Sequence, residues 1–383
     1  MPMGTKSFDY PIKIALLSGA IKNAGDYLIV KRSKELLCSI YPNCTITQFE
    51  RLLSLENYLS DINNHDILIF GGGPGYIPNL YPAHIPLVSD LNKIKIPIFV
   101  LGMGWFGQDD RSETLYNYSL TRDTLELFKR VEGDTKLLGC RDWFSVTALR
   151  NSGITGGYMT GCPAWYNLEF VNRIKVMRDL SQGIKKICVS DPAQLENADL
   201  AFQVVKYLRG NLPNSQIKFL FHRGDKADKF THSSVGNKLQ ELRTKLEKME
   251  VVCKNIAYAA DGFKDYDDCD LHIGFRVHAH IYNLSRRNVS ILIEEDGRGA
   301  GINNALGLDN IKAYEYGINS ERNGTRIINS VGHTPNTFLM YQLDDYISNL
   351  WNSNFLKMNN AFSSMNFYYH QMIEHIKSII EFV

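Results

Sequence analysis

The sequence predicts an α/β protein made of two successive open α/β units and a C-terminal helical tail. Short apolar runs recur along the chain, segments with helical apolar spacing separate them, and the whole pattern restarts near residue 186. Continuous apolar strands that alternate with helices are typical of a parallel sheet covered on both faces. A chain of 383 residues is long enough for two domains.

The first unit is expected to contain five strands and at least two helices. The predicted strands are short apolar runs at residues 12–17, 44–49, 66–70, 98–101 and 137–140. Helical spacing predicts helices over 27–40 and 52–62. Residues 158–163 close this half, and residues 167–181 are interpreted as the connection to the next one. The first domain is therefore placed at residues 1–175.

The second unit repeats the alternation and ends in the tail. Its predicted strands are residues 186–190, 216–221, 251–252, 270–273 and 290–293. Its predicted helices are residues 239–249, 280–286 and 302–308, and residues 337–382 are predicted to form a long helical tail rich in aromatic residues. These patterns place the second domain at 176–336 and the tail at 337–383. Two such units suggest two Rossmann-like halves that face a cleft.

Composition excludes several classes of partner. Lys plus Arg number 42 and Asp plus Glu number 41, so a net charge of +1 gives no basic field for nucleic acid. No segment approaches the roughly 18 apolar residues of a membrane span, and the first ten residues lack the apolar core of a signal peptide. The seven cysteines are odd in number and scattered, which favours reduced thiols in a cytoplasmic protein.

Charged residues and glycines follow several predicted strands. Ligands of open α/β sheets bind outside the carboxyl ends of the strands, so these positions are expected to converge on one cleft. The residues concerned are Gly71, Gly102, Arg141, His222, Arg276 and Gly297.

The segment 274–281 is the most informative of these strand ends. It places Arg276, His278 and His280 two residues apart where an apolar run ends. Arg and His at such a position are suited to anionic ligands. The alternative is that the two histidines are hydrogen-bonded core groups.

The glycine run 71–75 removes side chains, so that backbone N–H groups can approach a ligand. It lacks the Lys-Ser/Thr of a P-loop and is not Gly-x-Gly-x-x-Gly, so ordinary nucleotide binding is not supported. The alternative is a tight strand-to-helix turn. Asn23, Gly25 and Asp26 are interpreted either as lining the entrance of the same ligand site or as an ordinary helix cap and turn.

Two further groups carry charge at strand ends. Arg141 is expected to point to the cleft while Asp142 caps a helix, unless the two form only a surface pair. His222 and Arg223 join an imidazole suited to acid–base chemistry and a guanidinium suited to carboxylate or phosphate. A solvated polar loop is the alternative for that group.

Metal and hydrolase sites are not predicted. Four residues with metal-binding side chains gather between 268 and 280, but they match neither Cys-x-x-Cys nor His-Glu-x-x-His: Cys269, His272, His278 and His280. No Gly-x-Ser-x-Gly elbow occurs, which argues against a Ser-His-Asp hydrolase.

Taken in order, the motifs resemble the polysaccharide pyruvyl transferase family from about residue 12 to about residue 310. They are Asn23-x-Gly25-Asp26, Gly71-Gly72-Gly73, Gly102-x-Gly104, Arg141-Asp142-x-x-Ser145, Thr160-Gly161-Cys162-Pro163 and Arg276-x-His278-x-x-Ile281. The resemblance implies a two-domain fold like that of GT-B glycosyltransferases. It also implies transfer of a pyruvyl group from phosphoenolpyruvate to a sugar, giving a cyclic ketal.

The chain departs from the family pattern in one turn and in the tail. Many relatives have a Lys in the turn after the late strand, where this chain has Glu294-Glu295-Asp296-Gly297-Arg298-Gly299, with Arg298 the nearest cation. The three acidic residues are expected to face the acceptor or the solvent, because they would repel a phosphate. The aromatic tail lies outside the resemblance.

Under this hypothesis the second half binds the donor and supplies the acid. Arg276 and Arg223 bind the donor anions, with Arg298 as a weaker third, and Gly297 and Gly299 belong to the same side. His278 is the phosphate ligand or general acid, and His222 competes with it for the acid role. The acceptor side is assigned to Asn23, Gly25, Asp26, Gly71, Gly72, Gly73, Trp105 and Arg141. The expected partners are phosphoenolpyruvate as co-substrate and a sugar or glycan-lipid acceptor, with no cofactor, no metal and a possible homodimer.

Two other functions stay open at this point. A GT-B-like glycosyltransferase would bind a nucleotide sugar, with residues 297–299 at the pyrophosphate. A non-catalytic glycan-binding protein would present Trp105 at its surface, flanked by glycines, while Trp143 and Trp165 are expected in the core.

Overall fold

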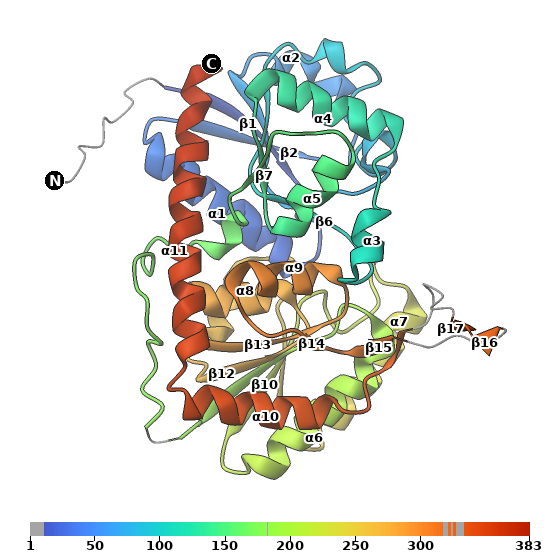
Figure 1. Ribbon diagram of the computed structural model, residues 1–383, viewed down its shortest axis with the longest axis vertical. Helices are drawn as coiled ribbons and strands as arrows, with labels where there is room; N and C mark the ends of the chain where they lie inside the picture. The colour runs from blue at the N-terminus through green and yellow to red at the C-terminus, as the bar shows by residue number, and fades with distance from the viewer. Residues whose placement is uncertain (1–10, 182, 317–320, 323–324, 327–332) are drawn as a thin grey trace.

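The computed structural model describes residues 11–181, 183–316, 321–322, 325–326 and 333–383. Figure 1 shows two bodies of sheet and helix, one above the other, with α11 (Leu356–Lys377) running beside both. All strands within the larger sheets are parallel. The expected α/β class with two sheet-containing halves is confirmed.

The first half contains two four-stranded sheets. The first has the order β2-β1-β3-β5, with β1 Lys13–Ser18, β2 Thr45–Glu50, β3 Ile67–Phe70 and β5 Ile98–Val100. The second has the order β4-β6-β7-β8, with β4 Gly73–Tyr76, β6 Met103–Trp105, β7 Leu138–Cys140 and β8 Gly157–Met159. The strand order reverses between β1 and β3, and that point is the first switch point.

Glycines mark the places where the chain passes from one of these sheets to the other. Gly71 and Gly72 separate β3 from β4, and Gly102 lies between β5 and β6. Gly72 has φ 101° and Gly102 has φ 68°, a region that other residues rarely adopt. The glycine run 71–75 was expected to be a loop or turn, and that expectation is wrong for its second part, which is strand β4.

The second half holds one six-stranded sheet in the order β11-β10-β9-β12-β13-β14. Its strands are β9 Lys186–Ser190, β10 Gln216–Phe221, β11 Val252–Asn255, β12 Leu271–Gly274, β13 Val289–Glu294 and β14 Ile311–Lys312. Counted from β9, this is the order 3-2-1-4-5-6 of a doubly wound nucleotide-binding sheet. The order reverses between β9 and β12, which is the second switch point. Two short hairpins follow, β15 Tyr314–Tyr316 with β18 His333–Pro335, and β16 Glu321–Arg322 with β17 Thr325–Arg326.

Helices connect the strands. They are α1 Ala24–Ile40, α2 Leu59–Ile62, α3 Ser112–Tyr116, α4 Arg122–Thr135, α5 Trp143–Asn151, α6 Ala198–Asn211, α7 Ser233–Glu247, α8 Val277–Ser285 and α9 Gly297–Leu306. The helix expected over 52–62 is wrong at its start, because helical structure begins only at Glu56. Leu52 and Leu53 are 44% and 50% exposed, so they are not part of a buried helix face.

The tail consists of two helices rather than one. α10 Leu339–Asn352 and α11 meet at Asn354 and Phe355, which both have positive φ. α11 packs on the first half, where the Tyr41 hydroxyl donates to the carbonyls of Ile376 and Lys377 at 2.9 and 3.1 Å. His375 Nε2 lies 2.9 Å from the Val100 carbonyl oxygen in the same half. The tail therefore returns from the second half to the first.

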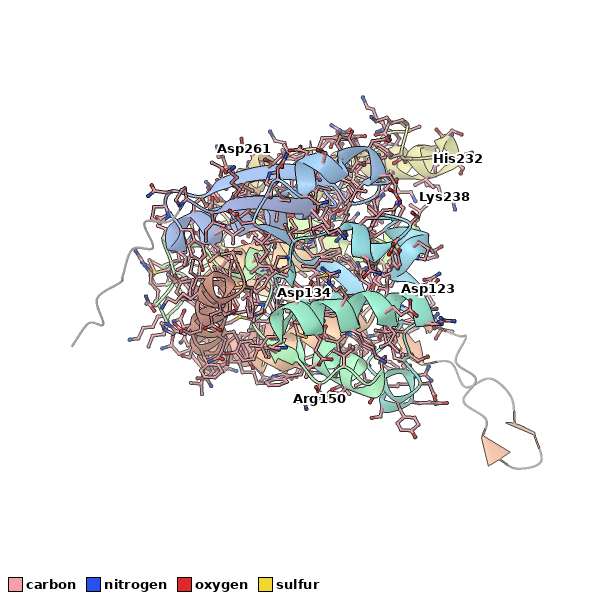
Figure 2. The ribbon with its side chains drawn as sticks, turned by 90° about the horizontal axis from the view of Figure 1, so that it is seen from above. Asp123, Asp134, Arg150, His232, Lys238 and Asp261 are labelled. Atoms are coloured by element: carbon pink, nitrogen blue, oxygen red, sulfur yellow. The ribbon has the colours of Figure 1, made fainter. Side chains whose placement is uncertain are left out.

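The two halves are in contact through their loops. The Ala24 backbone N–H donates to the His222 carbonyl at 3.0 Å, and the Gly297 N–H donates to the Gly107 carbonyl at 3.0 Å. Lys22, which is 2% exposed, forms an ion pair with Asp228 at 2.7 Å. Seen from above, labelled charged residues such as Asp123, Lys238 and Asp261 lie at the outside of the molecule (Figure 2). Within the described residues, no helix has the length and apolar character needed to cross a membrane.

Candidate functional site

Arg276 and Asp191 occupy the second switch point. Asp191 directly follows β9 and Arg276 lies two residues after β12, so both stand at the carboxyl ends of the two strands where the order reverses. Arg276 Nε and Nη2 each donate to Asp191 at 2.7 Å, and Nη2 also reaches the Pro192 carbonyl at 3.0 Å. Burial alone would lower the pKa of Arg276, but the Asp191 carboxylate outweighs it and the pKa is raised. The guanidinium is thus a fixed cation at the usual ligand position of such a sheet.

Buried hydrogen bonds from neighbouring strands hold the backbone at Arg276. Its N–H donates to Ser190 Oγ at 3.1 Å, and His272 Nε2 lies 3.1 Å from the same oxygen. Ser290 Oγ lies 2.7 Å from His272 Nδ1 and 2.8 Å from His280 Nδ1. His272 and His280 are therefore hydrogen-bonded core groups, and for His280 this is the alternative considered for the two histidines of the segment 274–281. Among the described residues, no three His, Cys, Asp or Glu side chains gather in a way that could hold a metal ion.

His278 differs from those two histidines because it lies where the halves meet. A Cβ added to Gly25 would overlap the His278 ring, so the glycine makes room for the imidazole. Burial, together with the positive charges of Arg141, Arg298 and Arg276, lowers the pKa of His278 to about 3. Three guanidinium groups from the two halves therefore act electrostatically on a neutral imidazole.

In the turn after β13, the charged side chains Asp296 and Arg298 bond to each other. Asp296 caps α9, accepting from the Arg298 N–H at 3.0 Å, and it pairs with the Arg298 guanidinium at 2.9 and 2.6 Å. Arg298 also lies 4.4 Å from the centre of the Phe106 ring, across the contact between the halves. Burial lowers the pKa of Arg298, but the paired Asp296 outweighs it and the pKa is raised.

The acidic residues of this turn do not face the solvent, which was one of the two orientations expected for them. Glu294, Glu295 and Asp296 are 1%, 5% and 6% exposed. Glu295 accepts from the backbone N–H groups of Ala193 and Gln194 at 2.7 and 3.0 Å. Burial raises the pKa of Glu295 to about 7, although these hydrogen bonds oppose the shift. The three carboxyl groups are thus bound within the protein.

The two glycines assigned to the donor side have packing roles. A Cβ on Gly297 would lie 2.6 Å from the Asp109 carbonyl and 2.7 Å from Trp105 Cζ2, so this glycine allows α9 to contact the first half. A Cβ on Gly299 would lie 2.9 Å from Glu294 Cγ, on the sheet side of α9. The structure brings Gly297 to the boundary between the halves and directs Gly299 away from it.

The first switch point gathers glycines around an Asp and an Arg. Asp26, Arg51 and Gly71 to Gly73 line a space of about 10 Å³, which is room for one water at most. Asn23 Nδ2 donates to Asp26 at 3.3 Å, and Arg51 Nη1 donates to the Gly72 carbonyl at 3.2 Å. Burial raises the pKa of Asp26, while the charges of Arg51, Arg223 and Arg298 lower it.

Arg51 is a site residue that the sequence reasoning missed. It follows the end of β2 at Glu50, and its guanidinium lies so close to Gly19 that a side chain there would collide with it. The rule that singled out Arg141 and Arg276, a cation just past a strand end, would have found Arg51 as well. Arg51 was overlooked because a helix was expected to begin at the next residue.

Arg141 is 3% exposed and bonds within the first half. Its Nε donates to Asp142 at 3.0 Å and its Nη2 to the Trp105 carbonyl at 3.1 Å, while Gly104 leaves room for the guanidinium. Asp142 caps α5 as expected, accepting from the Ser145 N–H at 2.8 Å. Arg141 and Asp142 do not form a surface ion pair, which was the alternative for them, because Asp142 is fully buried.

The predicted exposure of two tryptophans is wrong. Trp105 was expected at the surface, but it is fully buried, with ring centres 5.3 Å from Tyr118 and 5.2 Å from Phe144. Trp143 was expected in the core, but it is 48% exposed and its Nε1 donates to the Tyr368 hydroxyl at 3.0 Å. Trp165 lies in the core, as predicted.

His222 and Arg223 follow β10 and differ in exposure. His222 is fully buried, its Nε2 lies 2.8 Å from the Tyr266 hydroxyl, and its Nδ1 is buried without a hydrogen bond. Burial places the pKa of His222 well below its usual value, and the nearby Arg276 lowers it further. Arg223 is exposed and lines a cavity of about 210 Å³ with Arg276 and Asp191.

The structure therefore brings six of the predicted residues to one boundary. Electrostatic or packing contacts join Gly25, Asp26, Arg141, Arg276, His278 and Arg298. Three arginines together with neutral His278 make a boundary suited to an anion with more than one negative group.

Comparison with known proteins agrees with this architecture. The family model described as polysaccharide pyruvyl transferase matches residues 23–282. No curated protein matches the sequence.

Several solved structures are similar in fold. S. aureus MnaA, in its co-structure with UDP, is similar at 11% identity with a TM-score of 0.55, over 97% of this chain and 98% of that one. The Neisseria meningitidis UDP-GlcNAc 2-epimerase bound to UDP-GlcNAc has 11% identity and a TM-score of 0.48, over 97% of this chain and 99% of that one. The identity with MnaA is too low to carry more than the fold, which is the two-domain GT-B-like arrangement that the resemblance implied.

Proposed function

The chain belongs to the polysaccharide pyruvyl transferase family, and we propose that it moves the pyruvyl group of phosphoenolpyruvate onto a sugar as a cyclic ketal. The observation that carries the proposal is the group around His278. Arg276, Arg298 and Arg141 all act on this one imidazole at the boundary between the halves. Phosphoenolpyruvate carries a phosphate and a carboxylate on three carbons, and such a pair of anions needs several fixed cations.

The reaction sets clear demands on the site. The CH₂ carbon of the enol takes up one proton, which leaves the neighbouring carbon electron-poor. One sugar hydroxyl bonds to that carbon and loses its proton, phosphate departs with its bonding electrons, and a second hydroxyl closes the ring and loses its proton. The products are the ketal and inorganic phosphate. This proposed chemistry requires neither a metal nor another cofactor.

His278 is the proposed acid, but only once the donor is bound. With a pKa of about 3 in the free protein, its imidazole carries no proton to give at neutral pH. Burial is the larger cause of this low pKa and the charge of the three arginines the smaller one. Anions placed among the arginines would cancel the second cause, so donor binding should raise the pKa of His278. Binding should therefore take up a proton. Calorimetry in two buffers of different ionisation enthalpy measures this uptake, and His278→Asn should abolish it.

The acceptor is proposed to approach from the first half. Asp26 has a raised pKa because it is buried, which suits a carboxylate that accepts a proton from a sugar hydroxyl. The space beside it holds one water at most, so the sugar ring lies at its mouth rather than inside it. Trp105 is no longer part of this proposal, because its ring is enclosed by Tyr118 and Phe144.

The test is thermal shift and calorimetric titration with phosphoenolpyruvate, alongside UDP, GDP and CMP sugars. Stabilisation by phosphoenolpyruvate alone is expected, with loss of the response in Arg276→Ala. Arg122→Ala is the matched control, since Arg122 is 88% exposed on α4. Stabilisation by a nucleotide sugar instead would contradict the proposal and support a glycosyltransferase. Binding of a sugar without any phosphorylated donor would support a glycan-binding protein.

A further inference from the structure

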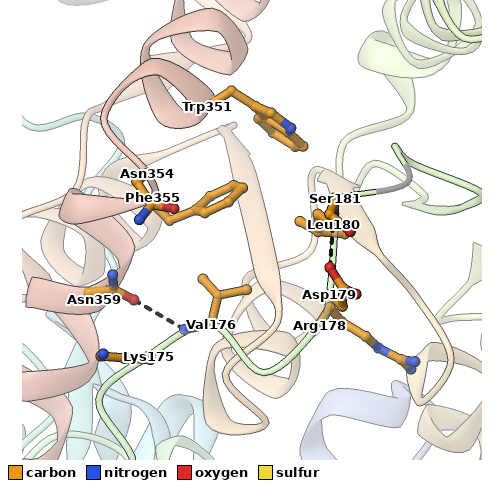
Figure 3. A pocket seen from close by; sticks show the side chains of 10 residues that line it. All are labelled: Lys175, Val176, Arg178, Asp179, Leu180, Ser181, Trp351, Asn354, Phe355 and Asn359. Atoms are coloured by element: carbon orange, nitrogen blue, oxygen red, sulfur yellow. Dashed lines mark hydrogen bonds between the residues drawn. The ribbon is translucent and has the colours of Figure 1, made fainter.

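A second cavity lies outside the boundary described above. It has a volume of about 460 Å³ and is enclosed by the connection at residues 175–181 and the corner between α10 and α11. Figure 3 shows the rings of Trp351 and Phe355 projecting from the corner toward Val176 and Leu180 of the connection. The two rings meet edge to face with centres 4.9 Å apart. One wall of the cavity is therefore aromatic, and the opposite wall combines two aliphatic side chains, Val176 and Leu180, with charged and polar ones.

Polar groups without protein partners line the same cavity. Within the described residues, the Lys175 ammonium, the Asn354 side-chain amide and the Trp351 indole N–H make no hydrogen bond. Other lining groups are already engaged: Asn359 Oδ1 accepts from the Val176 N–H at 3.1 Å, and Asp179 accepts from the Ser181 N–H at 3.0 Å. The unused donors and acceptor are thus placed beside the aromatic wall.

The backbone at this corner adopts an uncommon conformation. Asn354 has φ 50° and Phe355 has φ 59°, and neither is glycine. The left-handed region is unfavourable for a bulky side chain such as Phe. Strained residues of this kind gather at functional sites. Here the strained pair presents both of its side chains to the cavity.

We propose that this cavity binds a pyranose unit of a glycan, away from the reacting groups. A pyranose ring has a face of C–H groups that stacks on the negative face of an aromatic ring, and an edge of hydroxyls that needs amide, indole and ammonium partners. A cavity of mixed apolar and polar lining matches that division. The proposal rests on the proposed function in one respect, since it takes the sugar to belong to the acceptor glycan.

The site would hold a part of the glycan that is not being modified. The cavity is built from the connection and from the corner that leads into α11, and α11 itself contacts both halves. Occupation would anchor a long acceptor without touching the donor anions. Binding of free oligosaccharide should therefore be independent of phosphoenolpyruvate.

Saturation-transfer NMR with lactose, maltose and chitobiose on the full chain tests the proposal. At least one of the three should bind, and Trp351→Ala should weaken that binding about tenfold, the size of effect that one aromatic contact supports. Lys175→Ala, an exposed change that leaves packing intact, should weaken it less. Tyr341→Ala is the matched control on α10, since Tyr341 is 79% exposed and does not line the cavity.

The variant Phe355→Gly tests whether the Phe355 ring serves sugar binding or only folding. Glycine accepts φ 59° without strain, which offsets part of the packing lost with the half-buried ring, so the variant should stay folded while losing sugar binding. The proposal is overturned if no disaccharide binds, if binding survives Trp351→Ala, or if UDP rather than sugar occupies the cavity. Failure of the proposed function would show separately, as absence of a phosphoenolpyruvate response that depends on Arg276.

Discussion

The two switch points differ in how they prepare for a ligand. The first, between β1 and β3, is lined by glycines and by Asp26 and Arg51, with room for one water at most. The second, between β9 and β12, carries the Arg276–Asp191 ion pair beside a cavity of about 210 Å³. In the first half, glycines without side chains let the backbone lie close to the boundary. In the second half, the charged Arg276 and Asp191 line an open cavity. The second half therefore offers more room and fixed positive charge for a small anion than the first half does.

The charges of the second half are fixed before any ligand arrives. Arg276 and Arg298 each hold a carboxylate through two hydrogen bonds, so neither guanidinium must be reoriented when an anion binds. Fixed cations of this kind stabilise developing charge without a cost in reorganisation. The following predictions test this difference between the halves, beginning with the largest expected effect.

Arg276→Lys should reduce turnover by roughly 10² to 10⁴, the range for loss of one anion clamp. Lysine keeps the charge but cannot reproduce the planar double contact with Asp191, so the cation is no longer fixed. Steady-state kinetics with phosphoenolpyruvate and a sugar acceptor measures the loss. Near-full turnover in this variant would show that the second switch point does not bind the donor.

Gly25→Ala should destabilise the protein by about 1–3 kcal/mol and reduce turnover, because the new Cβ overlaps the His278 ring. Gly133→Ala is the matched control: this glycine is also helical, and its added Cβ would have no neighbour within 4 Å. That change should stabilise the protein by up to about 1 kcal/mol. Urea unfolding measures both. Equal behaviour of the two variants would mean that the halves do not meet at His278.

Lowering the pH from 6.5 to 4.5 should destabilise the second half first. The pKa values of His278 and His280 are lowered to about 3 by burial, so below pH 6.5 only the unfolded chain takes up these protons. Each such histidine removes about 1.4 kcal/mol of stability for every pH unit. Glu295, whose pKa is raised to about 7, acts in the opposite direction. Between pH 4.5 and 7 its carboxyl group is protonated in the folded protein but not in the unfolded chain, so its contribution to folding stability falls as the pH rises.

The histidines outnumber the opposing carboxyl groups. Five described histidines have lowered pKa values. Four of them lie in the second half, namely His222, His272, His278 and His280, and the fifth is His375 of the tail. Hydrogen exchange at pH 5.5 should therefore show earlier loss of protection over residues 186–306 than over residues 13–159. A stability that stays flat or rises on acidification would contradict the shifts.

Strand ends were the part of the site that the sequence predicted well. The rule that ligands bind past the carboxyl ends of parallel strands singled out Arg141, Arg276 and Gly297, and the structure brings all three to the boundary. The rule works because apolar strand cores are visible in the sequence and the topology fixes which end is which.

Burial of individual side chains could not be predicted in the same way. Trp105 is flanked by glycines, and the sequence does not reveal that those glycines serve the packing of Trp105 and Arg141 rather than exposure. The acidic turn was misjudged because its partners, Ala193 and Gln194 for Glu295, are about a hundred residues away. The break between α10 and α11 was missed because Asn354 and Phe355 carry no glycine or proline signal.

Tyr41→Phe is the smallest change predicted and tests how the tail joins the first half. The Tyr41 hydroxyl is buried and donates to the last carbonyls of α11, at Ile376 and Lys377. Its removal takes one donor away from these two helix-end carbonyls, at an expected cost of about 1–2 kcal/mol. Tyr341→Phe, at a 79% exposed position in α10, should change stability by less than about 0.5 kcal/mol. Chemical unfolding separates the two, and an equal, negligible effect would mean that the end of α11 does not stabilise the first half.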